Sequence, residues 1–253
     1  MTTLGADAEL DPLAGLVPGD DGAYIVEGRS VAMPVRVRSA RMASATFLVP
    51  ADTAQSVIAS TGLTVARRAR GKCVVSLALV KYVDCDLGDY DELGLCFVVE
   101  DPPGAAPTPK GGVAAYIHRL PVSQAFTCHA GRGIWGFPKW VDELSVEVDG
   151  RGATATLAGE VSVRLKRGRI AVPSRPMTMV CYSNDAAGGL LRTEWITHNQ
   201  STRIGFGRSV AEVDVTGVGP FASDLRTLGF PRKPLMTMFA GAMRATFEAP
   251  VRL

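Results

Sequence analysis

The chain has 253 residues, 47% of them hydrophobic, and 27 basic residues nearly balance 25 acidic ones. A formal net charge of +2 gives no basis for a nucleic-acid or membrane-surface partner. The five cysteines are widely spread and include no Cys-x-x-Cys pair, so a disulfide framework is not expected. Because no secretory signal pattern and no run of about 18 apolar residues is present, the sequence predicts a cytoplasmic protein outside the membrane.

The first residues differ in composition from the rest. Residues 1–21 combine acidic side chains with glycine and proline, which predicts a loosely held lead-in. No linker divides the remainder, and mainly β proteins of this length often form one unit. We therefore expect a single domain over residues 22–253.

In chain order, most predicted elements are strands. Runs of alternating or continuous apolar and β-branched residues predict extended segments. In the first half of the chain the predicted strands are residues 31–49, 72–83 and 95–100, and another strand begins at residue 113. Strands continue from residue 144 onward, with a hairpin turn at 149–150. The remaining predicted strands are residues 161–165, 169–172, 177–182, 190–197, 210–215 and 246–253. Two helices are expected, at residues 52–60 with Asp52 as the N-cap and at residues 221–228, while 84–94 and 102–112 are predicted to be loops.

The spacing of these elements indicates the fold class. No repeat of roughly 20–50 residues is present, and short strands recur with few helices between them. This pattern predicts a mainly β protein of the α+β type, built as an antiparallel barrel or double sheet with a few short helices.

One lysine stands among aromatic side chains. It is Lys139, in the segment Gly-Arg-Gly-Ile-Trp-Gly-Phe-Pro-Lys-Trp that spans residues 131–140. Burial beside these rings would disfavour the ammonium form and leave a neutral amine, which could attack a carbonyl carbon. The resulting iminium withdraws electrons from the neighbouring carbon. Alternatively, the lysine stem lies along the rings and its ammonium group stays in water.

Two motifs resemble one known family. Gly131-Arg132 followed by Phe137-Pro138-Lys139 resembles the Gly-Arg-(four residues)-aromatic-Pro-Lys signature of the acetoacetate decarboxylase family, and Tyr90-Asp91-Glu92 resembles its Tyr-x-Glu segment. The resemblance implies that Lys139 forms a Schiff base without a cofactor and that Glu92 is an active-site acid; without it, Glu92 would be taken for a solvated loop residue. Acetoacetate decarboxylase is itself the standard example of a lysine activated by an apolar pocket or a neighbouring cation. By analogy with relatives, we also expect a homo-oligomer.

The sequence departs from the family pattern beside the lysine. Trp140 stands where family members carry a second lysine, Gly133 stands where a glutamate is common, and residues 72–83 hold no carboxylate. Three interpretations stay open: decarboxylation of a β-keto acid, a pyruvate-type aldol condensation with dehydration, or a barrel that only binds an apolar carbonyl compound, with Trp140 filling the space of the lost cation.

Further residues are candidates for binding a small keto acid. The family places an arginine for the substrate carboxylate on the strand before the first helix, and Arg41 fits this position, or Arg38 if the register shifts. Arg132 could contact substrate or orient its turn, and Tyr82 and Tyr90 could donate to a substrate oxygen or simply pack. The three histidines lack ligand-like spacing and no phosphate loop is present, so neither a metal nor a nucleotide cofactor is expected.

Overall fold

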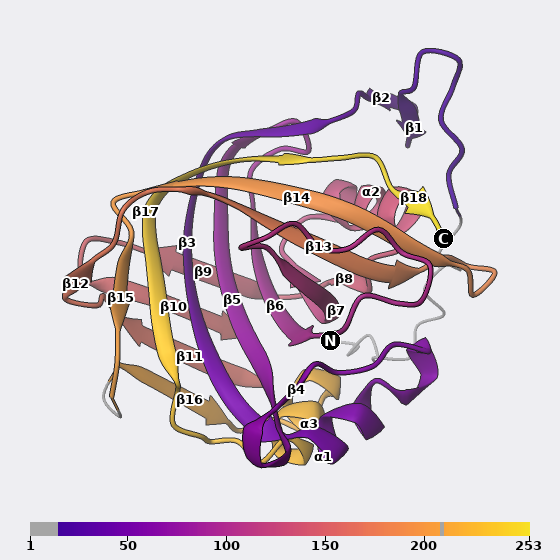
Figure 1. Ribbon diagram of the computed structural model, residues 1–253. Coiled ribbons are helices and arrows are strands. Elements are labelled where there is room, and N and C mark those ends of the chain that lie inside the picture. The colour runs from indigo at the N-terminus through magenta and orange to yellow at the C-terminus, as the bar shows by residue number, and fades with distance from the viewer. Residues whose placement is uncertain (1–14, 208–209) are drawn as a thin grey trace.

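Seven long strands close into a barrel (Figure 1). They are β3 (Val35–Pro50), β5 (Lys72–Cys85), β6 (Tyr90–Val98), β7 (Val113–Val122), β13 (Pro176–Asn184), β14 (Leu190–Gln200) and β17 (Met236–Phe247). β17 closes the ring because it pairs with both β3 and β14. The predicted mainly β barrel is confirmed, and its pairings are antiparallel except that of β7 with β13.

The computed structural model describes residues 15–207 and 210–253. The predicted lead-in therefore lies mostly outside the described residues. At its described end, the backbone N–H of Leu16 donates to the carbonyl of Gly133 at 2.8 Å, which ties this segment to a helix.

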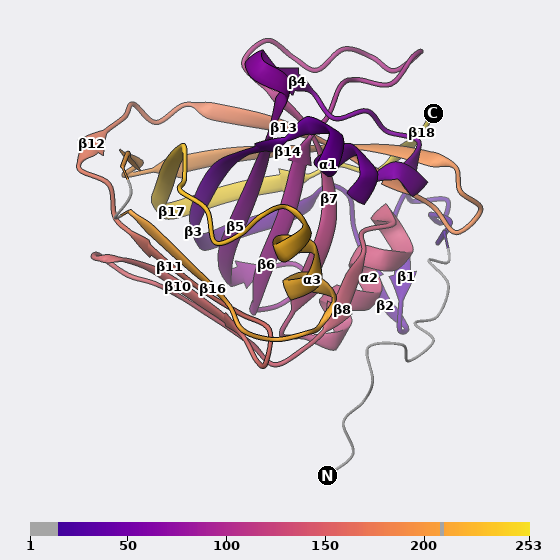
Figure 2. The ribbon, with the colours of Figure 1, turned by 90° about the horizontal axis from the view of Figure 1, so that it is seen from below.

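A second sheet packs on the outside of the barrel, beside β3, β5 and β6 (Figure 2). Its strands are β9 (Leu144–Val148), β10 (Gly152–Leu157), β11 (Val161–Lys166) and β16 (Ala211–Val215). The predicted hairpin at residues 149–150 joins β9 to β10. Shorter strands complete the fold: β1 (Tyr24–Val26), β2 (Arg29–Val31), β4 (Arg67–Arg68), β8 (Lys139–Val141), β12 (Ile170–Ala171), β15 (Arg203–Gly205) and β18 (Val251–Arg252).

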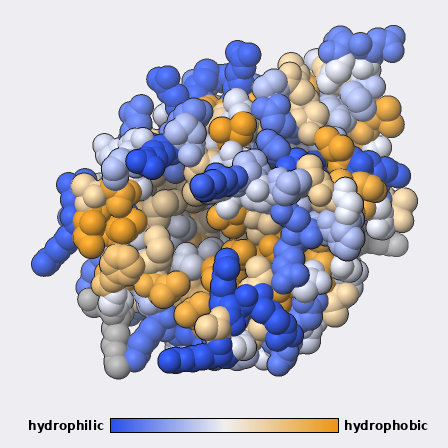
Figure 3. Space-filling view, viewed as in Figure 1, coloured by the Kyte–Doolittle hydropathy of each residue, from blue (hydrophilic) through white to orange (hydrophobic). Residues whose placement is uncertain are grey.

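Strand alternation creates two hydrophobic cores. On β5, Leu77 and Leu79 belong to an outer core with the second sheet, whereas Val80 and Tyr82 belong to an inner core within the ring. Successive side chains of a strand point to opposite faces, so each barrel strand contributes to both cores. Figure 3 shows that the face seen in Figure 1 is hollowed near its middle, with apolar side chains in and beside the hollow and polar ones along the rim.

The helices are α1 (Ala51–Val57), α2 (Ala125–Trp135) and α3 (Pro220–Thr227), with 3₁₀ turns η1 (Ala59–Thr61) and η2 (Ala69–Gly71). α1 and α3 lie where helices are predicted, although Pro50 rather than Asp52 is the N-cap of α1. α2 is not predicted, because its two glycines lower helix propensity, yet it forms by burying one side on the inner core. Among the described helices, none has the length and apolar character needed to cross a bilayer.

Two boundaries differ strongly from the prediction. The loop expected at residues 84–94 is shorter, because β6 already begins at Tyr90 and pairs there with Tyr82 of β5. The stacked rings of Tyr82 and Tyr90, 4.3 Å apart, stabilise this extension despite the acidic residues around it. At the C-terminal end, β17 begins at Met236 rather than near residue 246, since it is paired along β3.

Candidate active site

Lys139 owes its position to the way α2 ends. Gly136 adopts a left-handed conformation (φ 62°), and the N–H groups of Gly136 and Phe137 return to the carbonyls of Arg132 and Gly131. Glycine favours this helix ending, and Pro138 cannot continue the helix. The chain therefore reverses, and Lys139 begins β8 as a parallel neighbour of β7.

The side chain of Lys139 crosses α2 at Gly131. A Cβ atom at Gly131 would lie 2.5 Å from Cδ of Lys139, so any larger residue would displace the lysine. Arg132 acts on the same residue from its backbone, because its Nη1 donates to the Lys139 carbonyl at 3.0 Å. The first two residues of the motif thus provide room for Lys139 and a hydrogen bond to it.

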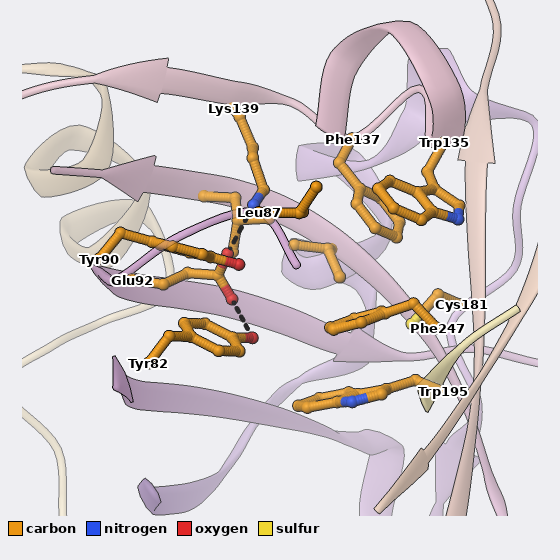
Figure 4. A pocket seen from close by; sticks show the side chains of 12 residues that line it. Tyr82, Leu87, Tyr90, Glu92, Trp135, Phe137, Lys139, Cys181, Trp195 and Phe247 are labelled. Carbon is orange, nitrogen blue, oxygen red and sulfur yellow. Dashed lines mark hydrogen bonds and ion pairs between the residues drawn. The ribbon is translucent and has the colours of Figure 1, made fainter. Parts of the chain in front are cut away.

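The Lys139 amine is enclosed and paired with a carboxylate (Figure 4). The residue is only 4% exposed, and its Nζ lies 2.8 Å from Oε2 of Glu92. Nζ also donates to Oγ1 of Thr127 at 3.3 Å and lies 5.0 Å from the ring centre of Tyr90. The Tyr82 hydroxyl donates to the other carboxylate oxygen, Oε1 of Glu92, at 3.2 Å.

Two opposing effects act on the proton between Lys139 and Glu92. Burial disfavours the ammonium and carboxylate forms, whereas their mutual attraction favours them. Transfer of one proton from Nζ to the carboxylate removes both charges together and leaves a neutral amine beside a neutral acid. The arrangement can therefore supply a nucleophile and a proton donor in one step.

The two tyrosines beside the pair are hydroxyl donors. Burial first, and then the negative charge of Glu92, raises the pKa of Tyr82 and of Tyr90 well above the ordinary value of 10.0. Both hydroxyls therefore keep their protons at neutral pH.

The ion pair faces a pocket with aromatic walls. The pocket contains about 400 Å³ of free space, counted to its open mouth. Its aromatic residues are Tyr82, Tyr90, Trp135, Phe137, Trp195 and Phe247, and the remaining apolar ones are Leu87, Ile117, Leu120 and Cys181. Figure 4 shows the two tryptophans and two phenylalanines on the side of the pocket away from Tyr82 and Tyr90.

Arg38 and Arg41, predicted to hold a carboxylate, lie outside this pocket. Arg38 forms exposed ion pairs with Asp84 and Asp86. Arg41 points to the outer face of β3, where its Nη1 donates to the Val148 carbonyl at 3.3 Å. This placement follows from strand alternation, since the neighbours of Arg41 in β3, not Arg41 itself, belong to the inner core.

Trp140 also points away from the pocket. It packs against the outer core, and its Nε1 donates to Oδ2 of Asp142 at 2.9 Å. Adjacent residues of a strand face opposite sides, so Trp140 does not fill space beside the Lys139 amine. Among the described residues, no group of three or more His, Cys, Asp and Glu side chains is placed to hold a metal ion.

Comparison with known proteins identifies the family of the chain. The family model described as acetoacetate decarboxylase matches residues 25–176, a span that includes Glu92 and Lys139. The chain belongs to the acetoacetate decarboxylase family. No curated protein gives a significant match to the sequence.

Solved structures share the acetoacetate decarboxylase fold over most of the chain. The acetoacetate decarboxylase of Legionella pneumophila superposes with a TM-score of 0.61 at 13% identity, covering 94% of this chain and 92% of that one. The enduracididine biosynthesis enzyme MppR, in complex with pyruvate, gives 0.62 at 14% identity and covers 94% and 98%. An acetoacetate decarboxylase-like enzyme from Sphingomonas wittichii RW1 gives 0.55 at 13% identity, with 90% and 96% covered.

This family member also has site residues that the sequence motifs do not reveal. Thr127 reaches the amine from α2, and Trp195 and Phe247, stacked 5.3 Å apart, come from β14 and β17. The only local signal for Thr127 is its position one helical turn before Gly131, which requires knowing that the segment is helical. Trp195 and Phe247 reach the site only because the barrel closes.

Proposed function

We propose that this protein is a lyase that forms a Schiff base between Lys139 and the carbonyl carbon of a small substrate. The observation that carries the proposal is the enclosed pair of Lys139 and Glu92, 2.8 Å apart at the wall of a pocket. Two solved structures of the structural neighbour MppR add support. One contains pyruvate, and the other contains the condensation product of pyruvate and imidazole 4-carboxaldehyde.

The first steps need only these two residues. One proton passes from Lys139 to Glu92, and the neutral amine attacks the carbonyl carbon. After the nitrogen proton moves to the oxygen, Glu92 protonates the hydroxyl of the carbinolamine, which leaves as water. An iminium then stands beside a regenerated carboxylate, so the charge of the site is the same as at the start.

The iminium leads to an enamine by one of two routes. A β-keto acid loses carbon dioxide, and the electron pair of the broken bond moves toward the iminium nitrogen. A carbonyl compound with an α-proton gives the same enamine when Glu92 takes that proton. In a decarboxylation, a proton from water reaches the enamine carbon, and hydrolysis of the resulting iminium releases the ketone and restores Lys139. In an aldol condensation, the enamine attacks an aldehyde, the adduct loses water, and hydrolysis of the iminium releases the product.

The other side chains at the pair have supporting roles in this scheme. The Tyr82 hydroxyl donates to Oε1 of Glu92 and leaves the other oxygen facing the amine. Thr127 accepts a hydrogen bond from Nζ and holds it at the pocket wall. Arg132 acts as a positioning residue, since it holds the Lys139 carbonyl from the opposite end.

Exchange of α-protons in heavy water tests the proposal, because every route through the enamine produces it. We expect wild-type protein to exchange the α-protons of butan-2-one, followed by NMR, and Lys139→Arg to lower the rate by about 10²-fold or more. Lys81→Arg is the matched control and should keep the wild-type rate. Equal exchange by wild type and Lys139→Arg would contradict the proposal and favour a barrel that only binds carbonyl compounds.

A further inference from the structure

We infer that the pocket binds an uncharged, apolar carbonyl compound rather than a keto acid. The inference rests on the proposed function, because it assumes that the carbonyl carbon is presented to Lys139. It concerns which substrates enter, whereas the proposed function concerns what Lys139 does to them.

The charge balance of the pocket favours an uncharged substrate. Lys139 and Glu92 are the only side chains with a formal charge among the described residues that line it, and they neutralise each other at 2.8 Å. Burial keeps the neighbouring acids neutral, since it raises the pKa of Tyr82, Tyr90 and Cys181. A substrate carboxylate would therefore be a second anion facing one cation, both before and after iminium formation.

The arginines near the site do not change this balance. Arg38 and Arg41 are engaged on the outside of the barrel. Arg132 donates to the carbonyl of Lys139 and is not among the residues that line the pocket. A carboxylate that leaves water for an apolar site without a partner cation bears its full desolvation cost. An uncharged carbonyl compound avoids that cost.

The pocket wall opposite the ion pair is aromatic. Trp135, Phe137 and Phe247 present rings opposite the ion pair, with Trp135 and Phe137 stacked 6.1 Å apart (Figure 4). Aromatic rings bind apolar and aromatic groups through large buried contact area. The wall opposite the amine is therefore suited to a hydrocarbon substituent.

Acid and ester pairs test the charge argument. Acetoacetate with methyl acetoacetate, and pyruvate with methyl pyruvate, present the same keto carbon with and without a negative charge. Each compound is incubated with the full chain, cyanoborohydride and Nα-acetyl-lysine. The adduct on the Lys139 peptide is quantified relative to the adduct on Nα-acetyl-lysine in the same tube, which corrects for the different electrophilicity of the four keto carbons. We expect the esters to exceed the acids by about 10-fold, the effect of 1.4 kcal/mol.

The outcomes separate this inference from the function on which it rests. Equal adducts, or a preference for the acids, would overturn the inference and leave Schiff-base formation intact. No adduct on Lys139 from any of the compounds would overturn both.

Glu92→Gln sharpens the same test. It removes the anion and leaves a lone cation, so the ratio of ester to acid adduct should fall. Asp91→Asn, on the opposite face of β6, is the matched control and should keep the wild-type ratio. An unchanged ratio in Glu92→Gln would contradict the charge argument.

Discussion

A lysine–carboxylate pair lies on each of the two faces of the β5–β6 hairpin, and the two pairs have different surroundings. On the outer face, Lys81 lies 3.3 Å from Asp91, with side-chain exposures of 32% and 15%. On the inner face, Lys139 lies 2.8 Å from Glu92, with side-chain exposures of 5% and 12%. Asp91 and Glu92 are neighbours in β6, so strand alternation alone assigns one carboxylate to each face.

The outer pair is a structural tether. Lys81 also contacts Glu147 and the Val146 carbonyl, which links the barrel to the second sheet. Partial burial acts to lower the pKa of Lys81, but the charges and hydrogen bonds of Asp91 and Glu147 raise it overall. This amine therefore stays an ammonium. The inner pair has only one carboxylate and lies against aromatic walls, which is the setting that the proposed chemistry needs.

The largest expected effect comes from removing the inner carboxylate. Glu92→Gln keeps the size of the side chain but removes the group that exchanges protons with Lys139 and substrate, so α-proton exchange of butan-2-one should fall about 10²–10⁴-fold. Asp91→Asn should leave the rate near that of wild type. Exchange that depends equally on both carboxylates would mean that the faces do not differ in chemistry.

The next largest effect on the exchange rate is expected from moving the amine of Lys139 while the lysine itself is kept. Gly131→Ala places a methyl group 2.5 Å from Cδ of Lys139, so the amine must move. A displacement of about 1 Å can cost about 10²-fold in rate. Gly150→Ala is the control, since a Cβ there meets nothing within 4 Å. NMR exchange rates, with thermal unfolding measured alongside, check the result; an active Gly131→Ala protein would contradict the placement of Lys139.

The inner tyrosines should make the protein sensitive to alkali. Because the pKa of Tyr82 in the folded state is raised above 10.0, the unfolded chain releases this proton first. The stability it contributes is complete below pH 10 and is lost as the pH rises toward the folded pKa. Tyr82→Phe should make this loss shallower by up to about 1.4 kcal/mol per pH unit.

Urea unfolding between about pH 8 and about pH 11 measures this effect, since the slope of the unfolding free energy against pH follows from linkage. Below pH 10 the curves of wild type and Tyr82→Phe should run parallel, whatever their offset from the lost hydrogen bond. Parallel curves above pH 10 as well would show that Tyr82 ionises as readily in the folded state.

The smallest effect is expected on the outer face. Lys81→Met breaks a partly exposed pair, so the free energy of unfolding should change by less than about 1 kcal/mol, and α-proton exchange should not change. Denaturant unfolding and the exchange rate together check this. A large loss of exchange would place Lys81 in the chemistry and remove the contrast between the two faces.

Local signals in the sequence were enough to predict much of the fold. The turn at residues 149–150 and the strands around it follow from period-two alternation and turn chemistry. α2 could not be read in the same way, because Gly131 and Gly133 lower its helix propensity and its stability comes from packing on the inner core. Most of β17 was missed because its partners, β3 and β14, lie far away in the sequence.

The residues of the site also fall into two groups, those that a local motif reveals and those that only the folded chain brings in. Lys139 and Glu92 lie in short motifs, and the structure brings them together through the end of α2 and the pairing of β6 with β5. The position of Arg41 depends on strand register, which a single residue reverses, and no local signal fixes it. Trp195 and Phe247 enter the pocket through barrel closure, a long-range event that no motif records.

One labelling experiment compares the two amines within a single molecule. After wild-type protein reacts with methyl acetoacetate and cyanoborohydride, peptide mapping gives the ratio of adduct on Lys139 to adduct on Lys81. The account predicts that Lys139 carries most of the adduct although it is the more buried of the two. Adduct on Lys81 and other exposed lysines, with none on Lys139, would contradict the central claim.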